Sequence, residues 1–449
     1  STSMEYPIFE LPFLGGSMAI ACIAIFHVFI AHFSVGSGFL MAFAEKKALD
    51  DGDSDTLSFL RKYSFLVLLV PYVLGTVTGV GIWFTVAVVS PRAISLLIHQ
   101  FVWFWAIEWV FFIIEVVSIH FYCFRWDSMD ARAHNRVGWI FAISSLITLF
   151  IINAILTFQL TPGSWAPGAT YAVWKAILNP TYIPTTILRS VVAFGLAGVF
   201  GIALMAFSPS VSKEVRERIV PLCYKFMLPS LLALPMGGWI FLALSPRAKT
   251  FLEGGAPVML IFLSFGMAAF IVIHISAGLS LWRKDFKPST LGACLLVLLA
   301  FISFGAFEFV REGVRKPFIV EGFMYSTGLT TKMAEGVDKR ATVALATKSG
   351  VLRLAPWALP PGSAVEKLSI AERGQAVYKA ACLRCHCVDG YNAMRPLVRG
   401  WSSGTMKHLL DHMAEVKSSM PDFPGTESEK LALIHYLLTL NPKKGGAAR

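Results

Sequence analysis

Charged residues are scarce in this sequence: Asp, Glu, Lys and Arg make up only 15% of its 449 residues, while hydrophobic residues make up 55%. Soluble domains carry about 25% charged residues. This shortage, with a mean hydropathy of +0.64, excludes an ordinary soluble fold and indicates a polytopic membrane protein. Acidic residues are the scarcer sign, which leaves a formal net charge of +11. We attribute this excess to loop charges that fix topology, and expect membrane lipid rather than nucleic acid as a partner.

Long apolar runs take the place of the missing charge. Backbone groups in lipid must be hydrogen-bonded within their own segment, so helices are the expected spanning form and the expected fold class is all-α. Eight runs are long enough to cross a bilayer. We place them near 14–44, 63–89, 96–124, 137–160, 184–207, 219–244, 257–282 and 289–311.

The loops between these runs alternate in charge, with 13 Lys and Arg residues in one set and 4 in the other. The rich set comprises Lys46, Lys47, Arg61, Lys62, Arg125, Arg132, Arg136, Lys213, Arg216, Arg218, Arg283, Lys284 and Lys287, and the sparse set comprises Arg92, Lys175, Arg247 and Lys249. By the positive-inside rule the rich set is cytoplasmic. We therefore expect the N-terminus outside, and an even number of spans returns the chain to that side.

Two of the seven cysteines belong to the run Cys382-Leu383-Arg384-Cys385-His386. This C-x-x-C-H spacing is typical of haem attachment, because two thiols on one turn can add to the vinyl groups while the next histidine faces the iron. We expect one covalent haem c, bound through Cys382 and Cys385, with His386 as its proximal ligand. Cys387 has no assigned role.

The segments around this motif complete a small domain. A short amphipathic helix near 371–378 precedes it, and a loop with Met420-Pro421 and an apolar closing helix follow. This order resembles a class I cytochrome c domain over residues 366–442. The resemblance implies Met420 as the sixth iron ligand, since a thioether on a loop can cap the far side of the iron. Met413 is the alternative, in a helical run where packing is the favoured role.

These patterns divide the chain into a membrane domain over residues 1–330, a linker over 331–365, and a cytochrome c domain with a polar tail over 366–449. The linker ends in the proline-rich segment 356–361, so we expect an extended surface tether. Haem attachment of this kind takes place outside the bacterial cytoplasm. We therefore expect the bacterial inner membrane, with the cytochrome c domain in the periplasm, in agreement with the loop charges.

Several ionisable residues lie inside the apolar runs, where they are costly and mark functional candidates. They are His27, His32, Glu108, Glu115, His120, Arg189, His274, Glu308, Arg311, Glu312 and Arg315, with His99 at the end of a span. Glu108 and Glu115 share one helix face; they could form a proton path, a pair at a haem edge, or a hydrogen-bonded pair of protonated acids. His27 alone would be a core histidine, but beside a c-haem and buried carboxylates a b-type haem ligand explains it better.

Five short motifs carry a second resemblance. They are Ala24-Ile25-Phe26-His27 with Gly36-Ser37-Gly38, Leu74-Gly75-Thr76-Val77-Thr78-Gly79, Ala106-Ile107-Glu108 with Glu115 and Arg125-Trp126-Asp127, Asn179-Pro180, and Glu312-Gly313-Val314-Arg315-Lys316-Pro317-Phe318. Over most of residues 13–325 the chain resembles subunit I of cytochrome bd oxidases. The resemblance implies one or two non-covalent haems of the b or d type, and a second membrane subunit as partner.

The resemblance also implies roles for single residues. His27 corresponds to the axial histidine of the high-spin haem pair, and Glu312 to the glutamate that serves the same pair. Glu108 and Glu115 correspond to two catalytic carboxylates, although their spacing is one residue shorter than expected. Arg315 corresponds to an arginine near the haem propionates, a suitable use of a bidentate cation.

The chain departs from that family in its second bundle. Arg189 stands where the histidine of the low-spin haem b is expected, and its methionine partner is only roughly matched by Met267. Protonated arginine does not ligate iron, so we expect this site to be empty or rebuilt, with Arg189 paired to a propionate or to Glu308 or Glu312. The connection 245–256 leaves no room for the long quinol-oxidising loop, and the cytochrome c domain replaces the ninth span. New haem positions could use His32, His99, His120 and His274.

Three functions remain open. The first is a terminal oxidase in which the c-haem takes electrons from a periplasmic cytochrome or redox enzyme and the high-spin pair reduces oxygen. The second is a non-catalytic electron-transfer subunit. The third is a quinol:cytochrome c oxidoreductase with a new quinone pocket. We favour the oxidase, because His27 and Glu312 are retained while the quinol-oxidising parts are not.

Overall fold

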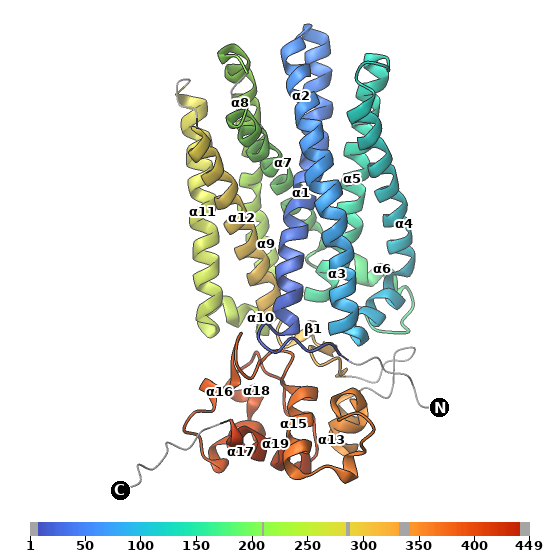
Figure 1. Cartoon of the computed structure of the whole chain (residues 1–449), viewed down its shortest axis with the longest axis vertical. Helices are drawn as coiled ribbons and strands as arrows, with labels where there is room; N and C mark the ends of the chain where they lie inside the picture. Colours follow the sequence, from blue (N-terminus) through green and yellow to red (C-terminus); the bar gives the residue numbers. More distant parts are fainter. Residues whose placement is uncertain (1–7, 209–210, 284–287, 332–341, 441–449) are drawn as a thin grey trace.

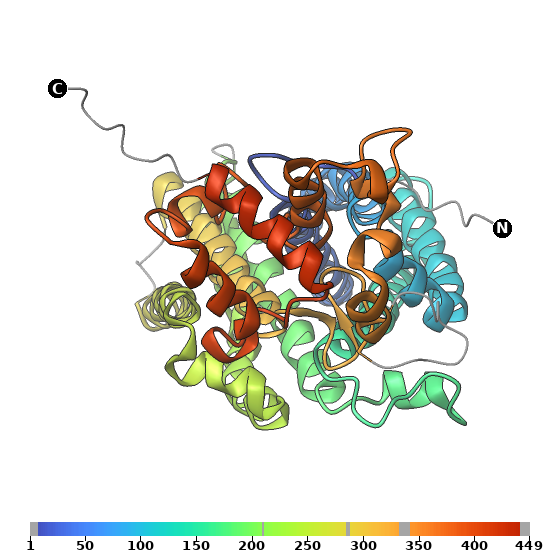
Figure 2. The same ribbon diagram turned by 90° about the horizontal axis from the view of Figure 1, so that it is seen from below.

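A bundle of long helices stands on a small helical domain in the computed structural model, which describes residues 8–208, 211–283, 288–331 and 342–440 (Figure 1). Within these residues, eight helices are long and apolar enough to cross a membrane. This number and the all-α class confirm the prediction from the sequence. The small domain covers one end of the bundle when the molecule is viewed along the helices (Figure 2).

The eight spans agree with the predicted ones to within several residues at most ends. They are α1 (Gly16–Asp51), α2–η1–α3 (Ser54–Val67, Leu68–Leu74, Gly75–Val89), α4 (Pro91–Phe124), α5 (Ala131–Leu160), α7 (Tyr182–Ala206), α8–η2–α9 (Lys213–Met227, Leu228–Leu232, Ala233–Ala243), α11 (Pro257–Trp282) and α12 (Thr290–Val314). Side-chain caps define several starts; the Asp53 carboxylate accepts from the Thr56 N–H at 3.1 Å. Pro71, which has no N–H to donate, lies in the π-helical turn η1.

Helix α1 lies at the centre because two glycines let its neighbours come close. A Cβ added to Gly36 would lie 1.9 Å from the Ala193 carbonyl oxygen on α7, and one added to Gly38 would lie 2.8 Å from Ala142 Cα on α5. The Gly36-Ser37-Gly38 motif therefore has a packing reason: it brings α5 and α7 against α1.

Short elements cover the end of the bundle that faces the small domain. They are α6 (Ala172–Ile177), α10 (Pro246–Thr250), η3 (Phe251–Gly255), and the antiparallel strands β1 (Phe318–Val320) and β2 (Met324–Tyr325). Arg247 connects α10 to the β1–β2 segment, since its guanidinium pairs with Glu321 and donates to the Lys316 carbonyl. The connection between spans six and seven is accordingly a short helical turn.

The small domain is built from short helices around one core. They are α13 (Val343–Ser349), α14 (Val351–Leu354), η4 (Pro356–Ala358), η5 (Val365–Lys367), α15 (Ile370–Ala381), α16 (Met394–Leu397), α17 (Ser403–Asp411), α18 (Met413–Val416) and α19 (Glu427–Thr439). Capping boxes start α15 and α19, at Ser369 with Glu372 and at Thr426 with Glu429. The two helices touch where Gly374 meets the Ala432 carbonyl.

The predicted extended linker is wrong for residues 342–365. This stretch forms helices, and Ala346, Val351 and Leu352 are buried in the core of the small domain. The buried Glu429 carboxylate accepts the N–H groups of Val351 and Leu352 at 2.9 and 3.0 Å, which satisfies the start of α14. Apolar residues spaced between the basic ones allow this packing. Residues 332–341, the tail 441–449, and Lys284 and Lys287 lie outside the described residues.

The small domain sits at the end where α1 begins and α12 ends (Figure 1). The α1–α2, α4–α5, α7–α8 and α11–α12 connections, which hold the predicted cytoplasmic charges, lie at the opposite end. This arrangement agrees with the predicted topology, in which the charge-poor end and the small domain share one side of the membrane.

Candidate functional site

A cavity of about 1140 Å³ lies between α1, α3, α4, α5, α7, α11 and α12 and extends to the small domain. It is larger than common small-ligand pockets, which measure about 300–1,000 Å³. Nine of the ionisable residues singled out from the sequence line it together: His27, His32, Glu108, Glu115, Arg189, Glu308, Arg311, Glu312 and Arg315. These residues come from α1, α4, α7 and α12 with its C-cap, so the fold brings together side chains that are far apart in the sequence.

His27 on α1 is held by the second span. Its Nδ1 lies 3.0 Å from Thr78 Oγ1, and that hydroxyl donates to the Leu74 carbonyl at 2.9 Å. The hydroxyl must then accept from Nδ1–H, which leaves the Nε2 lone pair for a ligand. A Cβ on Gly79 would lie 3.0 Å from His27 Cε1. The threonine and the second glycine of the span-two motif thus orient the ring.

Glu115 is buried among hydroxyl groups on the cavity wall. Tyr72 and Ser145 donate to its Oε2 at 2.8 and 3.0 Å, and Thr148 donates to Oε1. Glu108 lines the same cavity, and no hydrogen bond to its side chain occurs among the described residues. The two carboxyl groups therefore differ: Glu115 is fixed in place, while Glu108 can bind or release a proton without first breaking a protein contact.

Arg189 lies 3% exposed on α7 and meets an anion, as expected. Its Nη2 donates to Glu308 Oε1 at 2.5 Å, and its Nη1 lies 3.3 Å from His32 Nε2. Glu308 also accepts from Arg311 Nε at 2.9 Å. The carboxylate therefore bridges two cations, and the His32 ring nitrogen is already taken by Arg189.

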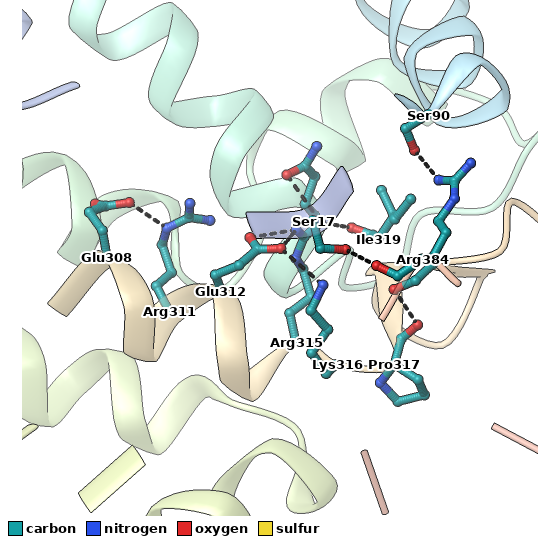
Figure 3. A network of polar contacts seen from close by, with 12 residues as sticks. Ser17, Ser90, Glu308, Arg311, Glu312, Arg315, Lys316, Pro317, Ile319 and Arg384 are labelled. Atoms are coloured by element: carbon teal, nitrogen blue, oxygen red, sulfur yellow. Dashed lines mark hydrogen bonds and ion pairs between the residues drawn. The ribbon is translucent and has the colours of Figure 1, made fainter. Parts of the chain in front are cut away.

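One turn further along α12, Glu312 is paired as well (Figure 3). Arg315 Nη2 contacts both of its oxygens at 2.5 and 2.6 Å, and Lys316 Nζ lies 3.5 Å away. Arg315 also donates to Gln159 and to the Ile319 carbonyl. The family-like run that begins at Glu312 thus forms a positively charged edge of the cavity.

The C-x-x-C-H turn follows α15 directly in the small domain. His386 Nδ1 donates to the Asn392 carbonyl at 3.1 Å, which leaves Nε2 for iron. Burial lowers the pKa of His386 below its ordinary value, against the opposing effect of this hydrogen bond, so the neutral ring that binds iron is favoured. Met420 is half-buried on its loop. Met413 packs against the domain core, the role expected for it.

Three other histidines considered as haem ligands lie apart from the cavity, and one buried ion pair lies elsewhere in the bundle. His99 is exposed, His120 bonds to the Val116 carbonyl, and both ring nitrogens of His274 have protein partners. A Glu45–His134 pair at 2.5 Å, with each side chain 2% exposed, was not predicted from the sequence. Glu45 directly follows the first predicted apolar run and His134 precedes the fourth, where both resemble ordinary loop residues, so no sequence signal pairs them.

The residues fit haem at both places. In the membrane, His27 provides a free nitrogen, and Arg189 Nε, Arg311 Nη1 and Arg315 Nε are buried donors without a partner in the described part of the chain. Such donors suit propionate carboxylates. In the small domain, two cysteines and a histidine with an oriented ring meet the needs of covalent attachment. Arg384, Asn392, Lys417 and Ser419 of the small domain also line the large cavity, so both places adjoin one space.

Comparisons with known proteins agree with both predicted resemblances and confirm them. Residues 17–240 match the family described as cytochrome bd terminal oxidase subunit I, and residues 369–437 match cytochrome C oxidase, cbb3-type, subunit III. Among solved structures, the chain is similar to the bd oxidase from Geobacillus thermodenitrificans, with a TM-score of 0.56 and 15% identity over 68% of this chain and 88% of that one. At this identity the likeness shows the fold alone. No curated protein matches the sequence.

Proposed function

Because this chain is a multi-pass membrane protein of haem-based electron transfer that joins a cytochrome bd subunit I domain to a cytochrome c domain, we propose that it is a terminal oxidase supplied by cytochrome c. The observation that carries this proposal is the shared cavity, whose walls include His27 and Glu312 of the membrane domain and Asn392 and Ser419 of the small domain. Electrons entering at the small domain can then reach the membrane site inside one chain.

In this proposal each residue has a defined task. Cys382 and Cys385 would hold one haem c, and His386 and Met420 would bind its iron. His27 and Glu312 would bind the iron of one or two haems of the b or d type. Arg315 and Arg189 would neutralise the propionates. These groups would supply electron transfer and oxygen reduction when bound. Glu108, which has no fixed hydrogen bond, would pass protons toward the site, and Glu115 would hold the water or proton next to it.

The ion pair of Arg189 and Glu308 supports the proposed entry of electrons at the small domain. It occupies the span-five position at which a low-spin haem ligand was expected. We propose that no low-spin haem binds there and that the small domain replaces it as the electron entry. The short connection between spans six and seven favours a cytochrome donor over quinol. A non-catalytic electron-transfer subunit is the second candidate, because Glu312 is already engaged by Arg315 and need not face an open iron.

The proposed setting is the bacterial inner membrane, with the small domain in the periplasm and a second membrane subunit beside the bundle. A periplasmic cytochrome or redox enzyme would be the donor. Quinone would bind only under the third hypothesis. We further propose that the membrane domain ends near residue 330, and that the folded stretch 342–365 belongs with the cytochrome c domain.

The choice between oxidase and electron carrier is tested on the purified protein. We expect it to oxidise a reduced soluble cytochrome with consumption of oxygen, far faster than it oxidises a quinol analogue. Carbon monoxide should shift the reduced spectrum, since an oxygen-reducing iron must have an open position. No shift would favour the non-catalytic subunit, and rapid quinol turnover blocked by quinone-site inhibitors would favour the oxidoreductase.

Replacement of His27 tests the membrane haem. In His27→Ala, non-covalent haem per chain should fall by the haem that this residue ligates, while covalent haem stays constant. Pyridine haemochrome spectra separate the two. His120→Ala is the matched control on the bundle, because His120 lies outside the cavity lining and should leave both contents unchanged. Unchanged b-type haem in His27→Ala would return His27 to a packing role.

A further inference from the structure

The segment that precedes α1 forms a seat for the small domain. Residues 8–15 run between the bundle and that domain as the dark-blue loop of Figure 1, held by the Phe9 N–H, which donates to the Val88 carbonyl at 2.9 Å. On the other side, the Tyr391 N–H donates to the Phe13 carbonyl at 2.8 Å. Cys387 is buried there, with its sulfur 3.8 Å from the Leu11 carbonyl.

Two glycines make this contact as close as it is. Gly390 has φ +143°, and a Cβ added to it would lie 2.2 Å from the Phe13 carbonyl oxygen. Gly15 has φ +73°, and its added Cβ would lie 3.2 Å from Cys387 Sγ. Residues other than glycine rarely adopt either backbone conformation. The loop 387–392 therefore packs backbone to backbone on the seat.

The same loop carries the group that orients the proximal histidine. The Asn392 carbonyl accepts from His386 Nδ1 at 3.1 Å, and the Asn392 side chain donates to the Cys385 carbonyl at 2.8 Å. Asn392 itself has φ +49°, so its carbonyl direction depends on how the loop is held. A shift of the loop at Tyr391 would move the acceptor of His386.

The attachment turn is fixed from its other side as well. Arg384, between the two cysteines, accepts at its carbonyl from Ser17 Oγ at 3.0 Å, and its Nη1 donates to Ser90 Oγ at 2.6 Å (Figure 3). Lys379 and Glu10 add an ion pair at 3.0 Å. The turn and the loop after it thus contact α1, the start of α4 and the seat at once.

We propose that the seat, residues 8–15, is a positioning element for the c-haem: it holds the small domain docked during turnover and, through Tyr391 and Asn392, sets the orientation and basicity of His386. This inference rests on the proposed haem c site. Hydrogen bonding at the ring nitrogen that does not bind the metal changes the basicity of a histidine ligand. Undocking should therefore change the reduction potential of the c-haem as well as the rate of electron transfer into the membrane.

The test is Gly390→Val in the full chain. Two readouts are measured: the midpoint potential of the c-haem by redox titration, and alkylation of Cys387 followed by peptide mass mapping, since Cys382 and Cys385 are blocked by haem. We expect Cys387 to change from protected to labelled and the midpoint potential to shift. Gly362→Val is the matched control, because Gly362 has φ +74° but no atom within 4 Å of an added Cβ; it should change neither readout. Gly390→Ala gives the same test with a smaller clash.

The outcomes separate the inference from the proposed function. Labelled Cys387 with an unchanged potential would overturn the positioning role, because the domain would then undock without affecting His386. Protected Cys387 and an unchanged potential would overturn the seat itself. Wild-type protein without covalent haem would overturn the proposed function, and this inference with it.

Discussion

Replacing Cys382 and Cys385 together with alanine is expected to abolish covalent haem and, with it, all oxidation of a soluble cytochrome. Both thioether bonds are lost, and a single axial histidine on a half-exposed turn does not retain haem during denaturation. Haem staining on a denaturing gel measures the first effect, and oxygen uptake with reduced cytochrome measures the second. The expected change is complete loss of both.

The membrane site should remain intact in this double variant. His27 and the cavity arginines make no hydrogen bond to either cysteine in the described structure, so non-covalent haem should stay at its wild-type amount. Cys387→Ala is the matched control: it removes the neighbouring thiol but leaves the attachment pair, and covalent haem should persist. A stained band in Cys382→Ala/Cys385→Ala would reject the haem c site.

The parts of this protein that the sequence predicts are those governed by local chemistry. Span positions follow from apolar length alone, and the C-x-x-C-H turn needs only five adjacent residues. The Thr78-Gly79 motif could be read as a signature, but its purpose, to orient His27, appears only when α1 and α3 lie together.

Contacts between distant segments escaped prediction for a physical reason. The linker was expected to be extended because its charges and prolines are local signals, whereas the buried Glu429 that caps α14 lies far along the chain. Likewise, nothing local joins Glu45 to His134 or Tyr391 to Phe13. For Arg189, the cost of burying a charge predicts a nearby anion, with Glu308 and Glu312 as the candidate carboxylates. The structure shows that Arg189 pairs with Glu308.

Breaking the Arg189–Glu308 pair should cost more than any surface change in this bundle. Removing one partner of a buried pair costs about 3–5 kcal/mol, because the other charge is left without compensation. Glu308→Gln removes the carboxylate that Arg189 and Arg311 share, whereas Arg189→Leu leaves Glu308 still bonded to Arg311 at 2.9 Å. We therefore expect Glu308→Gln to be the more destabilising of the two.

Unfolding by SDS titration in mixed micelles gives the comparison. Asp127→Asn is the control, because its pair with Arg61 is exposed, at 78% and 48% of the side chains, and exposed pairs contribute only about 0–1 kcal/mol. The double variant Arg189→Leu/Glu308→Gln should lose less than the sum of the single losses, since the pair acts as a unit. If Glu308→Gln were as stable as Asp127→Asn, the carboxylate would not be compensating two buried cations, and the position would be free to hold another group, such as the low-spin haem that the ion pair is proposed to replace.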